Sequence, residues 1–166
     1  MQTHMRRHRF PTALGDCALA WDDTGLLGFT LSGGDLPAAS APPPPPWITA
    51  LAARVQRHLA GQLQTFADAP YAFGTVTAFE RRVYELALAI PPGGTRSYGE
   101  LAAALSLPPG GSRAVAAALG ANPWPLLVPC HRIVGADGRM TGFSGPGGIR
   151  TKTRLLALEG AQLLSE

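Results

Sequence analysis

Two identical proline-glycine runs constrain the fold of this chain more than any other feature. Residues 91–94 and 108–111 both read PPGG. Proline lacks the backbone N–H that a helix interior needs, and glycine loses more conformational freedom than other residues when it is fixed in a helix. The second half of the chain is therefore predicted to form short helices separated by tight turns, over about 77–90, 97–105 and 112–119.

The first two of these helices each begin with a capping box. Thr77 with Glu80, and Ser97 with Glu100, place a hydroxyl and a carboxylate three residues apart, where they can satisfy the first free N–H groups of a helix. The second and third helices have the outline of a helix-turn-helix, with Arg113 standing among alanines. The same outline fits two packed helices of any small domain, so both interpretations stay open at this point.

The first half of the chain predicts a β-hairpin covered by a helix. The apolar segments 17–21 and 26–31 flank a turn rich in Asp and Gly, which is typical of two antiparallel strands. Six prolines in residues 37–46 favour an extended surface connector. Apolar residues at helical spacing then predict a helix from 47 to about 64. The basic residues 1–9, as a short terminus, are expected to be disordered.

The region after residue 120 predicts a turn, a strand, a loop and a last helix. Prolines in 121–125 exclude a regular helix, and the apolar residues 126–128 predict a short buried strand that leads into 129–132. A glycine-rich loop over 141–148 precedes the last helix, about 150–158, which ends before Gly160.

The charge of the chain is modest and uneven. Its 166 residues carry a formal net charge of +3; residues 1–78 hold five arginines and five aspartates, whereas 79–166 hold nine basic and six acidic residues. Any surface that binds phosphates is therefore expected in the C-terminal part. An apolar run of about 18 residues is missing, so we expect no membrane association and a cytoplasmic location.

The two cysteines, Cys17 and Cys130, are too few to indicate a disulfide scaffold. Cys130 stands in the run LVPCHRIV, where Pro129 fixes the backbone before it and His131 follows it. Inert buried cysteines are common in proteins. The apolar segment before Cys130 and the glycine loop after it favour instead a reactive thiol at a pocket.

A neighbouring imidazole that accepts the thiol proton would favour the thiolate form of Cys130. His131 can do this only through a bend of the chain or a bridging water, because adjacent side chains of an extended strand face opposite ways. Glu159, near the end of the last helix, is the candidate carboxylate that would hold the imidazole in one tautomer. The alternative for Glu159 is an ordinary surface acid.

Over residues 79–160 the chain resembles the O6-alkylguanine-DNA alkyltransferases. The motifs that carry the resemblance follow one another in order: FxxxVY at 79–84, IPxGxTxSYGxLA at 90–102, SRAV at 112–115, NP at 122–123, VPCHRIV at 128–134, GFSG at 142–145 and LEG at 158–160. The resemblance implies an α/β (α+β) fold. A small N-terminal lobe, residues 1–76, would hold an antiparallel sheet and a helix. It would pack on a mainly helical domain, 77–166, with a winged-helix-like helix-turn-helix.

The same resemblance implies the partner and the reaction. The protein would bind alkylated double-stranded DNA from the minor groove, as a monomer and without a cofactor, and flip the damaged nucleotide into a pocket. Cys130 would take the alkyl group from O6 of guanine irreversibly, with O4-alkylthymine left open as a second substrate. His131, through water, and Glu159 would move the thiol proton, and Asn122 would brace the site.

Further residues are assigned by this resemblance to the base and to the DNA. The residues expected at the flipped base are Tyr98, Ser144, Phe143, Ile133 and Val128. Tyr98 would stabilise or protonate the leaving guanine, and the backbone carbonyls of Cys130 and Ile133 would bind its exocyclic amine. The residues expected at the DNA are Ser112, Arg113, Ala114 and Arg132. Arg113 would fill the space left by the flipped nucleotide.

Two departures and three other functions stay open. The loop over 145–152 is about two residues longer than the family pattern, which leaves the size of the accepted alkyl group undecided. Some relatives hold a structural zinc, but His4, His8, Cys17 and His58 lack tight ligand spacing, so no metal is expected. A lesion-binding protein without chemistry, a helix-turn-helix regulator and a cysteine hydrolase are the other functions considered.

Overall fold

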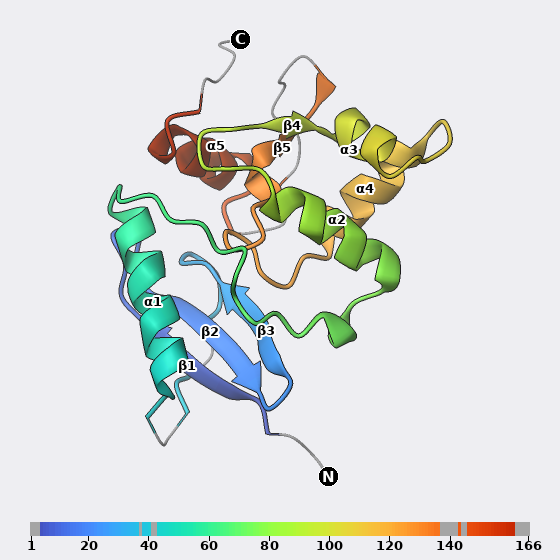
Figure 1. Ribbon diagram of the computed structural model, residues 1–166. Helices are drawn as coiled ribbons and strands as arrows, with labels where there is room; N and C mark the ends of the chain where they lie inside the picture. The colour runs from blue at the N-terminus through green and yellow to red at the C-terminus, as the bar shows by residue number, and fades with distance from the viewer. Residues whose placement is uncertain (1–3, 37, 41–42, 137–142, 144–145, 162–166) are drawn as a thin grey trace.

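The N-terminal part of the molecule is a three-stranded antiparallel sheet covered by one helix (Figure 1). In the computed structural model, which describes residues 4–36, 38–40, 43–136, 143 and 146–161, the strands lie in the order β1-β2-β3. The strands are β1 (Arg6–Phe10), β2 (Cys17–Asp22) and β3 (Gly25–Thr30), and the helix is α1 (Pro46–Leu59).

The predicted hairpin is confirmed, and its turn has a clear local cause. Asp22 Oδ1 accepts a hydrogen bond of 2.8 Å from the backbone N–H of Thr24, and Gly25 adopts a φ of 130°, which strains any residue with a Cβ. β2 therefore turns directly into β3, with Leu19 opposite Phe29. The alternating side chains of Cys17, Leu19 and Trp21 in β2 enter the core. In β3 an irregularity in the pairing interrupts the alternation, and Leu26 and Phe29 enter the core.

The expectation of disorder for the basic N-terminus is wrong for residues 6–9, which belong to β1. The unpaired edge of β2 offers backbone donors and acceptors to this segment, and the pairing runs from Arg6 opposite Trp21 to Phe10 opposite Cys17. Phe10 is buried in the core, and the backbone N–H of Arg7 donates to Ser40 Oγ at 2.9 Å. The burial of Phe10 and the pairing with β2 therefore order residues 6–9. Their charge pattern alone would indicate a solvated arm.

Helix α1 is confirmed, although it ends about five residues before the predicted end. It starts after Pro45, with a proline in its first turn, where the missing N–H costs nothing. Ala60 is the C-cap residue, and Gly61 follows with a φ of 101°. The side chains that α1 buries against the sheet include Ile48, Leu51 and Val55.

The C-terminal part consists mainly of four helices. They are α2 (Ala78–Leu88), α3 (Tyr98–Ala104), α4 (Gly111–Gly120) and α5 (Ile149–Leu158). Both predicted capping boxes are present, at Thr77 with Glu80 and at Ser97 with Glu100. The short strands β4 (Arg96–Ser97) and β5 (Ile133–Val134) pair in parallel beside them. The short 3₁₀ helices η1 (Phe73–Thr75) and η2 (Cys130–Arg132) also belong to the described part of the chain.

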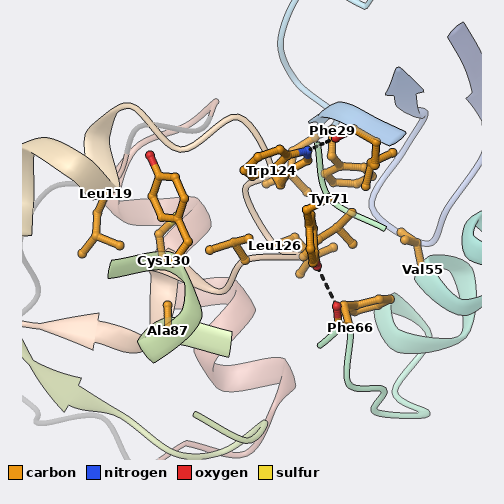
Figure 2. Packing of buried hydrophobic residues seen from close by; sticks show 14 of the residues in the cluster. Phe29, Val55, Phe66, Tyr71, Ala87, Leu119, Trp124, Leu126 and Cys130 are labelled. Carbon is orange, nitrogen blue, oxygen red and sulfur yellow. Dashed lines mark hydrogen bonds between the residues drawn. The ribbon is translucent and has the colours of Figure 1, made fainter. Parts of the chain in front are cut away.

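The hydrophobic core runs without a break from the sheet into the helices (Figure 2). Trp124 lies at the junction: its indole N–H donates to the carbonyl of Leu26 at 2.9 Å, and its ring meets that of Tyr71 edge-on at 5.2 Å. The division of the chain into lobes at residue 76 stays a prediction. Within the described residues, every helix is too short or too polar to cross a membrane.

The segment 126–128 is buried as expected, but it is not the predicted strand. The backbone N–H of Val128 donates to the carbonyl of Trp124 at 2.9 Å, which closes a turn, and Leu126 has a φ of 79°. A positive φ is costly for a residue with a branched side chain. The side chain of Asn122 explains the difference, because it bonds the backbone N–H of Trp124 and the carbonyl of Val128 and so holds the two ends of the turn together. Pro123 and Pro125, which lack a backbone N–H, also keep a strand from extending toward the N-terminus.

Candidate active site

Pro129 bends the chain directly before Cys130. Its φ of −80° and ψ of 66° form an inverse γ-turn, which the hydrogen bond of 2.7 Å from Cys130 N to the carbonyl of Val128 closes. The next three residues form the 3₁₀ helix η2, in which successive side chains are not on opposite sides as they are in a strand. The bend on which the predicted His131 relay depends is therefore present.

The carboxylate of Glu159 is the centre of a buried polar cluster. It stands at the end of α5 and accepts hydrogen bonds from His131 Nε2 at 2.9 Å, His58 Nε2 at 2.9 Å and the Arg132 guanidinium at 2.8 Å. Burial acts to raise the pKa of Glu159, but the bonds from Arg132, His131 and His58 outweigh it and hold this pKa well below its usual range. Glu159 is therefore ionised at neutral pH and is not a surface acid.

Because an ionised carboxylate only accepts hydrogen bonds, the shared proton lies on Nε2 of His131. Burial lowers the pKa of His131, against the opposing effect of Glu159, so the ring is neutral at pH 7. Its other nitrogen, Nδ1, is then unprotonated, and it is buried with no hydrogen-bond partner within the described part of the chain. This nitrogen is free to accept a proton.

The thiol of Cys130 is 6% exposed and is not paired in a disulfide. Burial raises its pKa, whereas a hydrogen bond from Asn122 and the positive charge of Lys152 lower it without reversing the shift. The sequence predicts an imidazole that lowers this pKa, and the structure shows a thiol that is protonated at rest. A thiolate at Cys130 therefore needs a nearby group that takes up the proton.

Asn122 braces the turn that carries the thiol, as the resemblance implies. Its side-chain nitrogen donates to the carbonyl of Val128 at 2.9 Å, and its side-chain oxygen accepts from the backbone N–H of Trp124 at 2.9 Å. Both bonds are buried and lie within the segment that ends at Pro129. Asn122 thus fixes the backbone from which Cys130 projects.

Arg132 is a correction to the predicted DNA surface. Its side chain is buried; its Nε and one terminal nitrogen bind the Glu159 carboxylate, and its other terminal nitrogen donates to the carbonyl of Ile90 at 2.6 Å. A guanidinium that is fully engaged inside the protein is not available to a phosphate. Its role is to hold η2 against α5 and the end of α2.

Lys152 is a member of the site that sequence reasoning missed. It is fully buried on α5, donates from Nζ to the carbonyl of Ile133 at 2.6 Å, and lies 5.7 Å from the ring centre of Tyr98. Burial lowers its pKa to about 8, while Cys130 acts in the opposite direction. The spacing of Lys152 and Glu159, seven residues or two helical turns apart, is the signal that places both on one face of α5.

The residues predicted at the substrate base lie partly within the described part of the chain. Tyr98 is half-buried at the start of α3, and Phe143 is half-buried against the core. The carbonyl of Ile133 accepts a hydrogen bond from Lys152 and so has one lone pair in use. The carbonyl of Val128 accepts from both Asn122 and the backbone N–H of Cys130, so both of its lone pairs are in use. Ser144 lies outside the described residues, as does most of the glycine-rich loop.

The predicted DNA-contacting residues of α4 lie at the solvent-exposed start of the helix. Arg113 and Ala114 are exposed in the first turns of α4, and Ser112 is half-exposed. Helix α4 packs on α3 through Val115 and its neighbours, and Gly110, with a φ of 89°, precedes its first turn. The helix-turn-helix pair is therefore present, with Arg113 directed away from the core.

His58 is a second residue that sequence reasoning placed only among weak zinc candidates. The structure puts its ring nitrogens on Glu159 Oε2 and on the backbone N–H of Gln64, at 2.9 and 3.0 Å. Within the described residues, no three His, Cys, Asp or Glu side chains are arranged to hold a metal ion. His58 and Glu159 are 101 residues apart, so no sequence spacing could reveal their contact.

Comparisons with known proteins identify relatives over most of the chain. Residues 78–161 match the family model of the 6-O-methylguanine DNA methyltransferase DNA binding domain. The methylated-DNA–protein-cysteine methyltransferase of Methanothermobacter thermautotrophicus is 35% identical over 148 residues, 89% of this chain and 81% of the relative.

Two solved structures from Mycobacterium tuberculosis are similar over most of their length. The crystal structure of its O6-methylguanine methyltransferase has a TM-score of 0.70 and 30% identity, covering 98% of this chain and 97% of the other. The protein called OGT, in complex with DNA, has a TM-score of 0.74 and 34% identity, covering 92% of each chain.

Proposed function

Since the chain belongs to the 6-O-methylguanine DNA methyltransferase family, we propose that it repairs alkylated DNA by moving the alkyl group from O6 of guanine to Sγ of Cys130. The observation that carries this proposal is the position of Cys130 at the start of η2, next to the His131–Glu159–Arg132 cluster. That cluster supplies a neutral imidazole with a free nitrogen, held in place by an ionised carboxylate.

The reaction is a displacement at carbon. The sulfur of Cys130 forms a bond to the alkyl carbon, the bond from that carbon to O6 breaks, and its electron pair stays on the guanine. The guanine then takes up one proton, for which Tyr98 is the candidate donor by family resemblance. The thioether that results has no good leaving group at neutral pH, so each protein molecule reacts once.

The thiol proton leaves through His131. Its Nδ1 is the unprotonated nitrogen, and a water between it and Sγ would carry the proton across, which turns the ring into an imidazolium. The negative Glu159 stabilises that cation through Nε2–H. Lys152 adds a positive charge near the sulfur, which favours the thiolate as it forms.

The DNA would dock on α3 and α4. Arg113 is exposed on α4, with small side chains at 114 and at 116–118, which allows the helix to approach the DNA closely. We propose that the helix enters the minor groove and that Arg113 fills the stack after the damaged nucleotide has turned out. A flipped base is required because Cys130 is nearly enclosed by protein.

The test uses duplex DNA that carries O6-methylguanine labelled in the methyl group. The expected result is covalent transfer of one label per protein molecule, with none to the Cys130→Ala variant. A matched variant, Cys17→Ala, should take up label as the unchanged protein does.

The other possible functions give different results in the same assay. Label released into solution, with repeated turnover, would indicate a hydrolase. Tight binding without transfer would indicate a lesion-binding protein, and binding that ignores the lesion would indicate a regulator. Any of these three results would contradict the proposed function.

A further inference from the structure

One buried histidine of the N-terminal part reaches the same carboxylate oxygen as the active-site histidine. His58, near the end of α1, and His131, in η2, both lie 2.9 Å from Glu159 Oε2. Both rings are completely buried. The chemistry described above uses His131, Glu159 and Arg132 but gives His58 no part.

The tautomer of His58 follows from its two contacts. The backbone N–H of Gln64 donates to Nδ1 at 3.0 Å, so Nδ1 carries no proton in the neutral ring. Nε2 therefore carries it and donates to Glu159. The ring is also packed against Phe66, with 5.6 Å between ring centres. These contacts leave His58 one orientation, in which its N–H is aimed at Glu159.

We propose that His58 is a positioning residue of the alkyl-transfer site, through which helix α1 sets the orientation and the charge of Glu159 toward His131. This inference rests on the proposed function and extends it to a residue outside the matched DNA-binding domain. Oε2 divides its negative charge between the two rings and Arg132. With His58 in place, Glu159 holds the His131 ring with its proton on Nε2 and its free nitrogen on Nδ1.

The groups around Glu159 fix the direction of the effect. His58 faces it from α1, His131 and Arg132 face it from η2, and Lys152 lies two turns earlier on its own helix, bound to Ile133. If the His58 donor is removed, more of the negative charge of Glu159 acts on His131. The imidazolium of His131 is then more stable at rest, and a protonated His131 accepts no proton from Cys130.

The test compares three variants in single-turnover transfer from O6-methylguanine DNA over a range of pH. His58→Phe fills the same space without the donor; it should slow transfer about tenfold or more, and the acid limb of the pH profile should move to higher pH. His58→Gln keeps an N–H donor and should restore most of the rate and the profile. Phe66→Leu is the matched control, because it loosens the packing on the same ring and keeps the hydrogen bond.

A purely structural role for His58 predicts a different pattern. In that case His58→Phe and Phe66→Leu would both lower the melting temperature, and neither would move the pH profile of transfer below that temperature. That result would overturn the inference. A tenfold loss in His58→Phe that His58→Gln does not recover would overturn it as well.

A second measurement needs no alkyl transfer and so separates this inference from the proposed function. NMR of protein labelled with ¹⁵N-histidine reports the tautomer of each of the four histidines. His131 should show the Nε2–H tautomer in the unchanged protein and should titrate at higher pH in His58→Phe. An unchanged His131 titration would reject the role of His58 even if the protein transfers alkyl groups. A shifted titration in a protein that transfers none would support the coupling and reject the proposed function.

Discussion

The two cysteines of this protein are both free and buried, and burial raises the pKa of both. Cys17 lies in β2 with the backbone of Ser32 and the hydroxyl of Thr12 near it, and the negative charge of Asp16 disfavours its thiolate. Cys130 begins η2 with the positive Lys152 and the amide of Asn122 near it. Both cysteines are therefore buried, but the nearby charge is negative at Cys17 and positive at Cys130.

The difference shows that reactivity is set by the neighbours that a thiol can use when the substrate arrives. The surroundings of Cys17 offer no cation and no free imidazole nitrogen among the groups that affect its pKa. Cys130 is adjacent to His131, whose Nδ1 is unpartnered within the described residues. The five predictions below test this contrast, from complete loss of transfer to a threefold slowing.

The largest effect is expected from exchanging the two thiols for alanine. Cys130→Ala should abolish alkyl transfer because it removes the only atom that forms the new bond. Cys17→Ala should leave transfer unchanged and lower the free energy of unfolding by roughly 1 kcal/mol, since it opens a small cavity in the sheet core. Transfer is followed with labelled O6-methylguanine DNA, and stability by urea unfolding. Equal rates of alkyl transfer in the two variants would show that Cys130 is not the acceptor.

The next largest effect is expected for Glu159→Gln. The change leaves Arg132 buried without its counter-charge, which should cost about 3–5 kcal/mol in the free energy of unfolding. Because His131 also loses its anchor, transfer should slow about a hundredfold. The surface pair of Glu85 with Arg81 is the matched control, and Glu85→Gln should cost less than about 0.5 kcal/mol.

The pH dependence of stability tests the same carboxylate. The pKa of Glu159 in the folded protein lies below its unfolded value of 4.5, so its stabilising contribution is present above about pH 4.5 and is lost as the pH falls further. Unfolding in urea at pH 7 and pH 3 should show a steeper loss for the unchanged protein than for Glu159→Gln. Parallel curves would mean that the cluster is not held by an ionised Glu159.

How far the sequence predicts this molecule depends on the distance along the chain between the residues that interact. The hairpin, both capping boxes and the helices after 77 follow from residues within a few positions of one another. The edge strand β1 and the contacts of Arg132 depend on partners elsewhere in the chain. The turn at 126–128 is local, but its apolar residues do not distinguish a buried turn from a buried strand. The family resemblance predicts Glu159 as a partner of His131. The helical spacing of Lys152 from Glu159 is a signal for Lys152, whereas no sequence signal predicts the contact of His58.

A smaller effect is expected from removing the polar neighbour of each thiol. Asn122→Ala loses the bonds to Val128 and Trp124, which should cost about 1–3 kcal/mol in stability and slow transfer about tenfold. Thr12→Val removes the hydroxyl that lies 3.9 Å from the Cys17 sulfur and should not alter transfer. Rates of single-turnover transfer measured on both variants decide the matter. A slower Thr12→Val would show that the two regions are coupled.

The smallest effect is expected for Lys152→Met, which keeps the length of the buried side chain and removes its charge. Transfer should slow about threefold at neutral pH because the thiolate loses a favourable charge. The pKa of Lys152 is about 8 when folded and 10.5 when unfolded, so the unfolded chain binds more protons between these values. Stability relative to Lys152→Met should therefore rise with pH across this window, as measured by urea unfolding. If the stability difference instead fell as the pH rises, the buried surroundings of Lys152 would favour its charged form.

The most direct test of Cys130 as the acceptor is mass spectrometry of peptides after reaction with methylated DNA. The unchanged protein should gain the mass of one methylene group, confined to the peptide that contains Cys130, in a yield that reaches one per molecule. Addition at Cys17, addition at several sites, or repair of the DNA without any gain in protein mass would contradict the proposal.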